Sequence, residues 1–83
     1  MRSIYNRPGI YVIRVAGALP PDWSDRLGGL TIVELGTARE CDVPVSELSG
    51  SLADQSALCG VLFTLYDDRF PLLYVEDLGP TEG

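Results

Sequence analysis

The segment between residues 48 and 75 constrains the fold more than any other part of this chain. Its sequence, LSGSLADQSALCGVLFTLYDDRFPLLYV, places two apolar runs on either side of an amphipathic, helix-like segment. Asp54 is suited to cap a helix from about Gln55 to Asp68, with Ser51 as the alternative cap. Pro71 turns the chain, and an apolar strand is expected from Leu72 to Glu76. The second half of the chain is therefore predicted to run strand, helix, strand.

The predicted helix has two apolar stripes along its length. Its inward stripe follows the spacing i, i+3, i+4 and i+7 and comprises Leu58, Val61, Leu62 and Leu65. A second stripe runs beside it and comprises Gln55, Cys59, Phe63 and Tyr66. The second stripe either widens the contact with the core or forms a surface that faces a partner.

The first half of the chain supplies three more elements. A strand is expected over residues 10–17, where Arg14 is the only charged residue. A short helix of two turns is expected over residues 20–27, because proline is tolerated in the first turn and Gly28 can end the last one. Trp23 and Leu27 would then share the face against the sheet. Two further strands are expected at residues 30–35 and 43–52.

The order of these elements is β-α-β-β-α-β. It predicts an α+β domain of the ferredoxin-like, split β-α-β type, with a four-stranded antiparallel sheet and two helices on one face. A chain of 83 residues is long enough for one such domain. Residues 1–9 are expected to form a loose N-terminal arm, and residues 78–83 a flexible C-terminal tail.

Charge and composition argue against several classes of function. The chain has 6 arginines, no lysine and 12 acidic residues, so its net charge is −6. This charge opposes binding to nucleic acid or to an anionic membrane surface, and the arginines are scattered along the sequence. No apolar run is long enough for a membrane span, and we expect a cytoplasmic protein.

The chain contains no histidine, which together with the lack of lysine removes most small-enzyme mechanisms. Cys41 and Cys59 match no zinc or CxxC spacing, so two free thiols are expected, with a single disulfide between them as the alternative. Asp67, Asp68 and Glu76 do not converge by spacing alone, and we expect no metal site and no cofactor.

Both faces of the first and last predicted strands are apolar. A sheet with helices on one face leaves its other face open, so we expect a cover, and a second copy of the chain is the simplest one. Arg14 lies within the first strand and is expected to pair with an acidic neighbour such as Glu76, or to hold an anion.

Parts of the sequence resemble a known group of proteins. The residues that carry this resemblance are Asp54-Gln55-Ser56-Ala57-Leu58, Gly60-Val61-Leu62, Leu65 and Pro71-Leu72-Leu73-Tyr74-Val75, with Gly17, Trp23-Ser24 and Gly29-Leu30-Thr31-Ile32 upstream. They resemble small, uncharacterised bacterial proteins that share an Asp-Gln-Ala-Ala-Leu-His-Gly-Leu-Leu helix before a Leu-Pro-Leu-Leu-Ser-Val strand. Cys59 stands where that group usually has histidine. The resemblance implies a small bacterial α/β domain from about Ile10 to Val75 and no particular activity.

These observations favour a small non-enzymatic interaction or regulatory module that acts as a homodimer. The alternative is a small-molecule-binding domain or cofactor-free enzyme with a pocket between the sheet and the helices, lined by Arg14, Tyr11, Gln55 and Trp23. A role as the partner of another small protein, as in toxin–antitoxin pairs, rests on size and acidity alone. The candidate ligand or partner surface comprises Arg14, Tyr11, Trp23, Gln55, Cys59, Phe63 and Tyr66.

Overall fold

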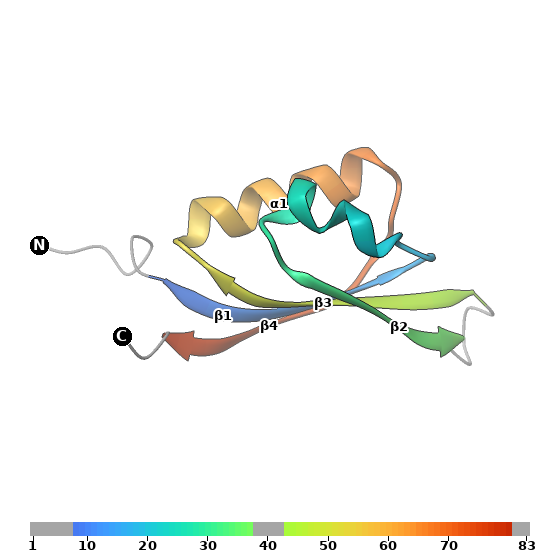
Figure 1. Ribbon diagram of the computed structural model, residues 1–83, viewed down its shortest axis with the longest axis horizontal. Coiled ribbons are helices and arrows are strands. Elements are labelled where there is room, and N and C mark those ends of the chain that lie inside the picture. Colours follow the sequence, from blue (N-terminus) through green and yellow to red (C-terminus); the bar gives the residue numbers. More distant parts are fainter. Residues whose placement is uncertain (1–7, 38–42, 81–83) are drawn as a thin grey trace, which may run out of the picture.

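The computed structural model describes residues 8–37 and 43–80 of the chain. Its elements, in chain order, are β1 (Gly9–Ala16), the 3-10 helix η2 (Pro21–Leu27), β2 (Thr31–Thr37), β3 (Pro44–Leu52), α1 (Gln55–Asp67) and β4 (Leu72–Pro80). Figure 1 shows the two helices on one side of a single twisted sheet. The chain is therefore an α+β domain, as its sequence predicts.

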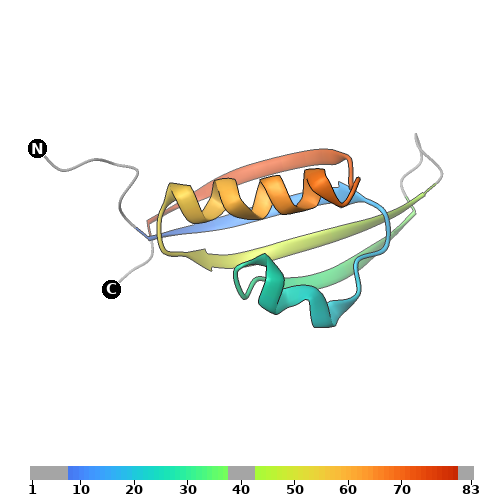
Figure 2. The same ribbon diagram turned by 90° about the horizontal axis from the view of Figure 1, so that it is seen from above.

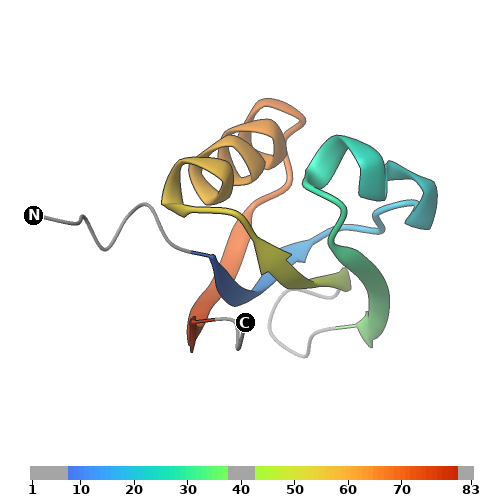
Figure 3. The same ribbon diagram turned by 60° about the vertical axis from the view of Figure 1, so that its left-hand side comes forward.

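The four strands are ordered β2-β3-β1-β4, and every neighbouring pair is antiparallel. β1 lies in the middle, where Ile13 is opposite Leu48 of β3 and Val75 of β4. β2 and β4 are the two edge strands. Seen along the sheet, α1 and η2 lie side by side over it (Figure 3), and from above α1 runs between β4 and β1 (Figure 2).

The core lies between the sheet and the two helices. Alternate residues of β1 are buried, so Tyr11, Ile13 and Val15 face the helices while Val12 and Arg14 face the open side. The helices complete the core with Leu27 from η2 and with Leu58, Val61 and Leu65 from α1. Leu62 is partly buried against this core. The predicted inward stripe of the helix is thus confirmed.

Helix α1 starts at its predicted cap. The backbone of Asp54 is extended, and its Oδ1 accepts a hydrogen bond from the Ala57 amide at 2.9 Å. This bond holds the pKa of Asp54 below its usual range, and the Ser56 hydroxyl lowers it further. The sequence therefore identifies the start of this helix correctly.

Element η2 is a 3-10 helix, a tighter form than the short helix that the sequence predicts. Its first turn is closed by the Trp23 amide, which donates to the Pro20 carbonyl at 3.0 Å, and Gly28 ends it in the left-handed conformation. The tight turns still bury Leu27 fully.

β1 and β3 agree with their predicted ranges to within one residue at each end, whereas two strands extend further than predicted. β2 continues to Thr37, and β4 continues to Pro80, four residues beyond the predicted end at Glu76. Residues 78–80 of the predicted tail therefore belong to β4, and Pro80 lies opposite Gly9 of β1. The predicted arm lies mostly outside the described residues, as does Cys41.

Candidate functional site

Four of the candidate residues were expected to line a pocket between the sheet and the helices: Tyr11, Arg14, Trp23 and Gln55. Tyr11 is 5% exposed within the core, whereas Arg14 lies on the opposite, open face of the same strand. Trp23 lies on η2 and Gln55 at the start of α1. The structure does not bring these four side chains together around one cavity.

Arg14 pairs with a different acid from the one that the sequence suggested. Its Nε donates to Glu47 Oε2 at 3.0 Å, because Glu47 lies directly opposite it on β3. Its guanidinium also stacks 4.9 Å from the centre of the Tyr74 ring on β4. Glu76 instead accepts a hydrogen bond from the Tyr74 hydroxyl, which raises the pKa of Tyr74 above its usual range. A connected set of polar side chains therefore crosses the open face of the sheet.

Trp23 connects the two helices. Its ring meets the Phe70 ring edge-on, with centroids 5.8 Å apart. Arg26 stacks 4.6 Å from the centre of the Trp23 ring and pairs with Asp68 at 3.3 Å. These contacts give Trp23 a structural role at the C-terminal end of α1.

A buried serine that the sequence did not single out ties the chain between β1 and η2 to the sheet. Ser46 is fully buried on β3, where its hydroxyl accepts from the Leu19 amide at 2.9 Å and donates to the Gly17 carbonyl at 2.7 Å. The signal that could have revealed it is a serine at an inward position between Val45 and Leu48.

The outer stripe of α1 is exposed. Phe63 and Tyr66 keep 68% and 79% of their surface exposed, and Cys59 beside them is an exposed free thiol. Gln55, at the start of the same stripe, is half-buried. Large aromatic side chains gain much from burial, so this stripe is an incompletely covered surface of the isolated chain.

β4 continues this exposed surface along the edge of the sheet. Four of its aliphatic side chains are exposed: Leu72, Leu73, Val75 and Leu78. Val75 lies on the same sheet face as α1, because it pairs with Ile13 in the core. We call Cys59, Phe63 and Tyr66, together with these four residues of β4, the α1–β4 surface. Seven of the nine exposed large hydrophobic residues in the described chain lie on α1 or β4.

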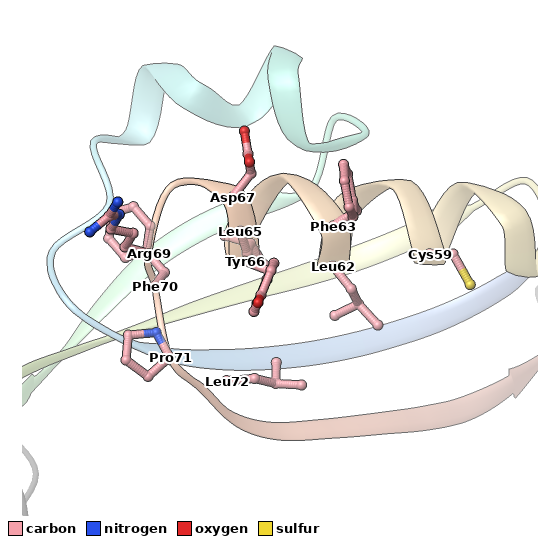
Figure 4. A pocket seen from close by; sticks show the side chains of 10 residues that line it. All are labelled: Cys59, Leu62, Phe63, Leu65, Tyr66, Asp67, Arg69, Phe70, Pro71 and Leu72. Atoms are coloured by element: carbon pink, nitrogen blue, oxygen red, sulfur yellow. The ribbon is translucent and has the colours of Figure 1, made fainter.

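A groove lies between α1 and the start of β4. Figure 4 shows Leu62 and Tyr66 extending from α1 toward β4, and Leu72 extending from β4 toward α1. Arg69, Phe70 and Pro71 close one end, and the groove has a volume of about 890 Å³. Most of its lining is apolar, with Asp67 and Arg69 as the charged groups. This arrangement can bind apolar side chains and carries little chemistry of its own.

Two further observations concern the described residues as a set. Across residues 8–37 and 43–80, no three cysteine or acidic side chains lie close enough to hold a metal ion. No helix in those segments has the length and apolar character needed to cross a membrane.

The comparisons with known proteins give a family and no activity. The family described as a domain of unknown function, DUF8691, matches residues 10–76, and the chain belongs to this family. The match confirms the expectation of an uncharacterised family over nearly the range that the motifs predicted. No curated protein and no solved structure matched the chain.

Proposed function

We propose that this member of the DUF8691 family is a small non-enzymatic interaction module that acts as a homodimer through the α1–β4 surface. The observation that carries the proposal is the continuity of that surface. The exposed stripe of α1 and Leu72, the first residue of the exposed strand β4, line one apolar groove. A monomeric domain seldom leaves so many large apolar side chains together in water.

The size of the surface supports two copies as the assembly. Phe63 and Tyr66 leave roughly 250 Å² exposed, taking about 150–250 Å² for a whole aromatic side chain. The four half-exposed aliphatic residues of β4 bring the total to roughly 500 Å² of apolar surface. Two copies would then cover roughly 1,000 Å², the lower limit for a specific interface.

The element order and the strand order β2-β3-β1-β4 support assigning this domain to the ferredoxin-like group. In that arrangement one edge strand and the helix beside it are available for contact with another chain. The motif resemblance and the two cysteines also favour a bacterial, cytoplasmic protein.

Light scattering on two double variants tests this proposal. The variant Phe63→Ser with Tyr66→Ser removes the aromatic part of the surface and is expected to run at the mass of one chain, while the wild type runs at twice that mass. The matched control, Val33→Ser with Leu35→Ser, changes two half-exposed apolar residues on the other edge strand, β2. It is expected to remain dimeric, and a monomeric wild type would refute the proposal.

A second candidate function is the binding of a small apolar molecule in the groove. Its volume of about 890 Å³ lies within the range of known ligand sites. The groove is less suited to this role, because its aromatic wall is largely exposed and would cover a small ligand on few sides. Small-molecule binding would be favoured if compounds from a metabolite panel raised the melting temperature of the wild type more than that of the Phe63→Ser, Tyr66→Ser variant.

A further inference from the structure

We propose that two copies of this chain pair β4 against β4 around a two-fold axis that passes through Val75, joining their sheets into one. This inference rests on the proposed homodimer and adds its geometry. β4 is an edge strand, so the outer row of its backbone amides and carbonyls has no strand beside it among the described residues. A second β4 would supply those hydrogen bonds.

The open face of the sheet is less suited to the contact. Arg14, Glu47, Tyr74 and Glu76 form their polar contacts there. Packing a second sheet on this face would remove these charged groups from water, and the desolvation free energy would oppose the association. Edge pairing leaves the polar side chains at the surface.

The position of α1 suits edge pairing as well. Seen from above, α1 runs between β1 and β4 (Figure 2). With neighbouring strands about 4.8 Å apart, a β4 pair would place the two α1 axes about 10 Å from each other. Packed helices commonly lie about 8–10 Å apart. Phe63 and Tyr66 of one copy would then meet the same stripe of the other across the axis.

Symmetry limits the possible registers. In an antiparallel pair, opposite residues lie on the same face of the sheet. The two-fold axis must therefore lie where one residue is opposite its own copy, and that residue is the centre of the register. Centres at Glu76 or Asp77 place identical carboxylates directly opposite each other, which is destabilising. A centre at Leu73 pairs only residues 72–74 of the strand, and a centre at Tyr74 pairs residues 72–76.

A centre at Val75 gives the longest pairing without opposed acids. Val75 meets its own copy, and Leu73 meets Asp77 of the other chain, within the part of β4 that lies beyond the register shift at Leu72. Glu76 meets Tyr74 of the other chain, a residue that already donates to a glutamate within its own strand. Arg14, stacked on Tyr74, adds positive charge beside these carboxylates. The regular pairing of β4 with β1 from Tyr74 to Asp77 includes this centre.

Disulfide trapping tests the register on the full chain. In a background with Cys41→Ser and Cys59→Ser, Val75→Cys places two thiols on opposite residues, whose Cα atoms lie about 4.5–5.5 Å apart. That distance is within the range of a disulfide. Leu72→Cys is the control, because its two copies would lie roughly 20 Å apart along the strands. A mixture of Leu73→Cys with Asp77→Cys brings its unlike thiols together.

We expect oxidised glutathione to link the Val75→Cys chains at micromolar concentration and to leave Leu72→Cys chains unlinked. The mixture of Leu73→Cys and Asp77→Cys is expected to give the mixed dimer, which tests the register even if Val75→Cys folds poorly. Equal linking of Val75→Cys and Leu72→Cys would overturn the inference. If the Cys41→Ser, Cys59→Ser protein is dimeric by light scattering but neither Val75→Cys nor the mixture forms a disulfide, the register alone is wrong. If that protein is monomeric, the homodimer is wrong too.

Discussion

Replacing Ser46 by alanine removes a single oxygen atom but is expected to destabilise this domain strongly. The hydroxyl of Ser46 joins the Leu19 amide to the Gly17 carbonyl, and the serine side chain is fully buried. Its removal leaves a buried donor and a partly buried acceptor without a partner. A buried polar group left unpaired costs about 1–3 kcal/mol, so we expect a loss of roughly 2–4 kcal/mol.

That loss is a large share of the total free energy of unfolding of the domain. A chain of 83 residues has a free energy of unfolding of about 4–12 kcal/mol. For a domain of this size each kcal/mol shifts the melting temperature by about 4–8 °C, which gives a decrease of roughly 10–30 °C. Thermal and urea unfolding, followed by circular dichroism at one protein concentration, measure the change.

The control for this experiment is Ser49→Ala on the same strand. Ser49 is opposite Val12 on the open side of the sheet, and its loss is expected to change the stability by less than about 0.5 kcal/mol. If Ser46→Ala cost no more than Ser49→Ala, the assignment of Ser46 as the link between β3 and the chain before η2 would be wrong.

Two more variants test the account of the fold. Gly17→Ala is expected to lower the free energy of unfolding by about 2–4 kcal/mol, because Gly17 has a φ of 119° and a Cβ would lie 2.8 Å from the Phe70 ring. The control is Gly29→Ala, where φ is 77° and the space around the residue is open, with an expected loss of about 1–2 kcal/mol. The carboxylate of Asp54 has a lowered pKa in the folded chain, so its charge stabilises the fold above the unfolded pKa near 3.8 and ceases to do so as the pH falls through the lower folded value. The difference in melting temperature between the wild type and Asp54→Asn is therefore expected at neutral pH and to shrink as the pH falls below 3.8 and through the lower folded value. A difference that stays constant with pH would count against the charged cap.

Helix α1 and its outer stripe could be predicted because they depend on local spacing. The side chains of Phe63 and Tyr66 recur at helical intervals beside the inward stripe, so their exposure follows once Leu58 and Leu65 face the core. Asp54 was identified for the same reason, since a cap contacts residues only three positions away.

The features that the sequence left open depend on strand register. Arg14 meets Glu47 because β1 and β3 are paired in one particular register, and residues 33 positions apart give no local signal of it. Ser46 is decisive for the same reason, since its partners belong to a distant segment. The β4 part of the surface was visible as apolarity on both faces, but its exposure depends on the strand lying at an edge.

Sedimentation equilibrium of the full chain over a dilution series measures whether two copies associate in solution. A species of twice the 9.0 kDa of one chain is expected at tens of micromolar, dissociating on dilution. Phe63→Ser is expected to shift the dissociation to higher concentration, because it removes one of the two aromatic groups of the α1–β4 surface. A single-chain mass for the wild type across the whole series would contradict the account.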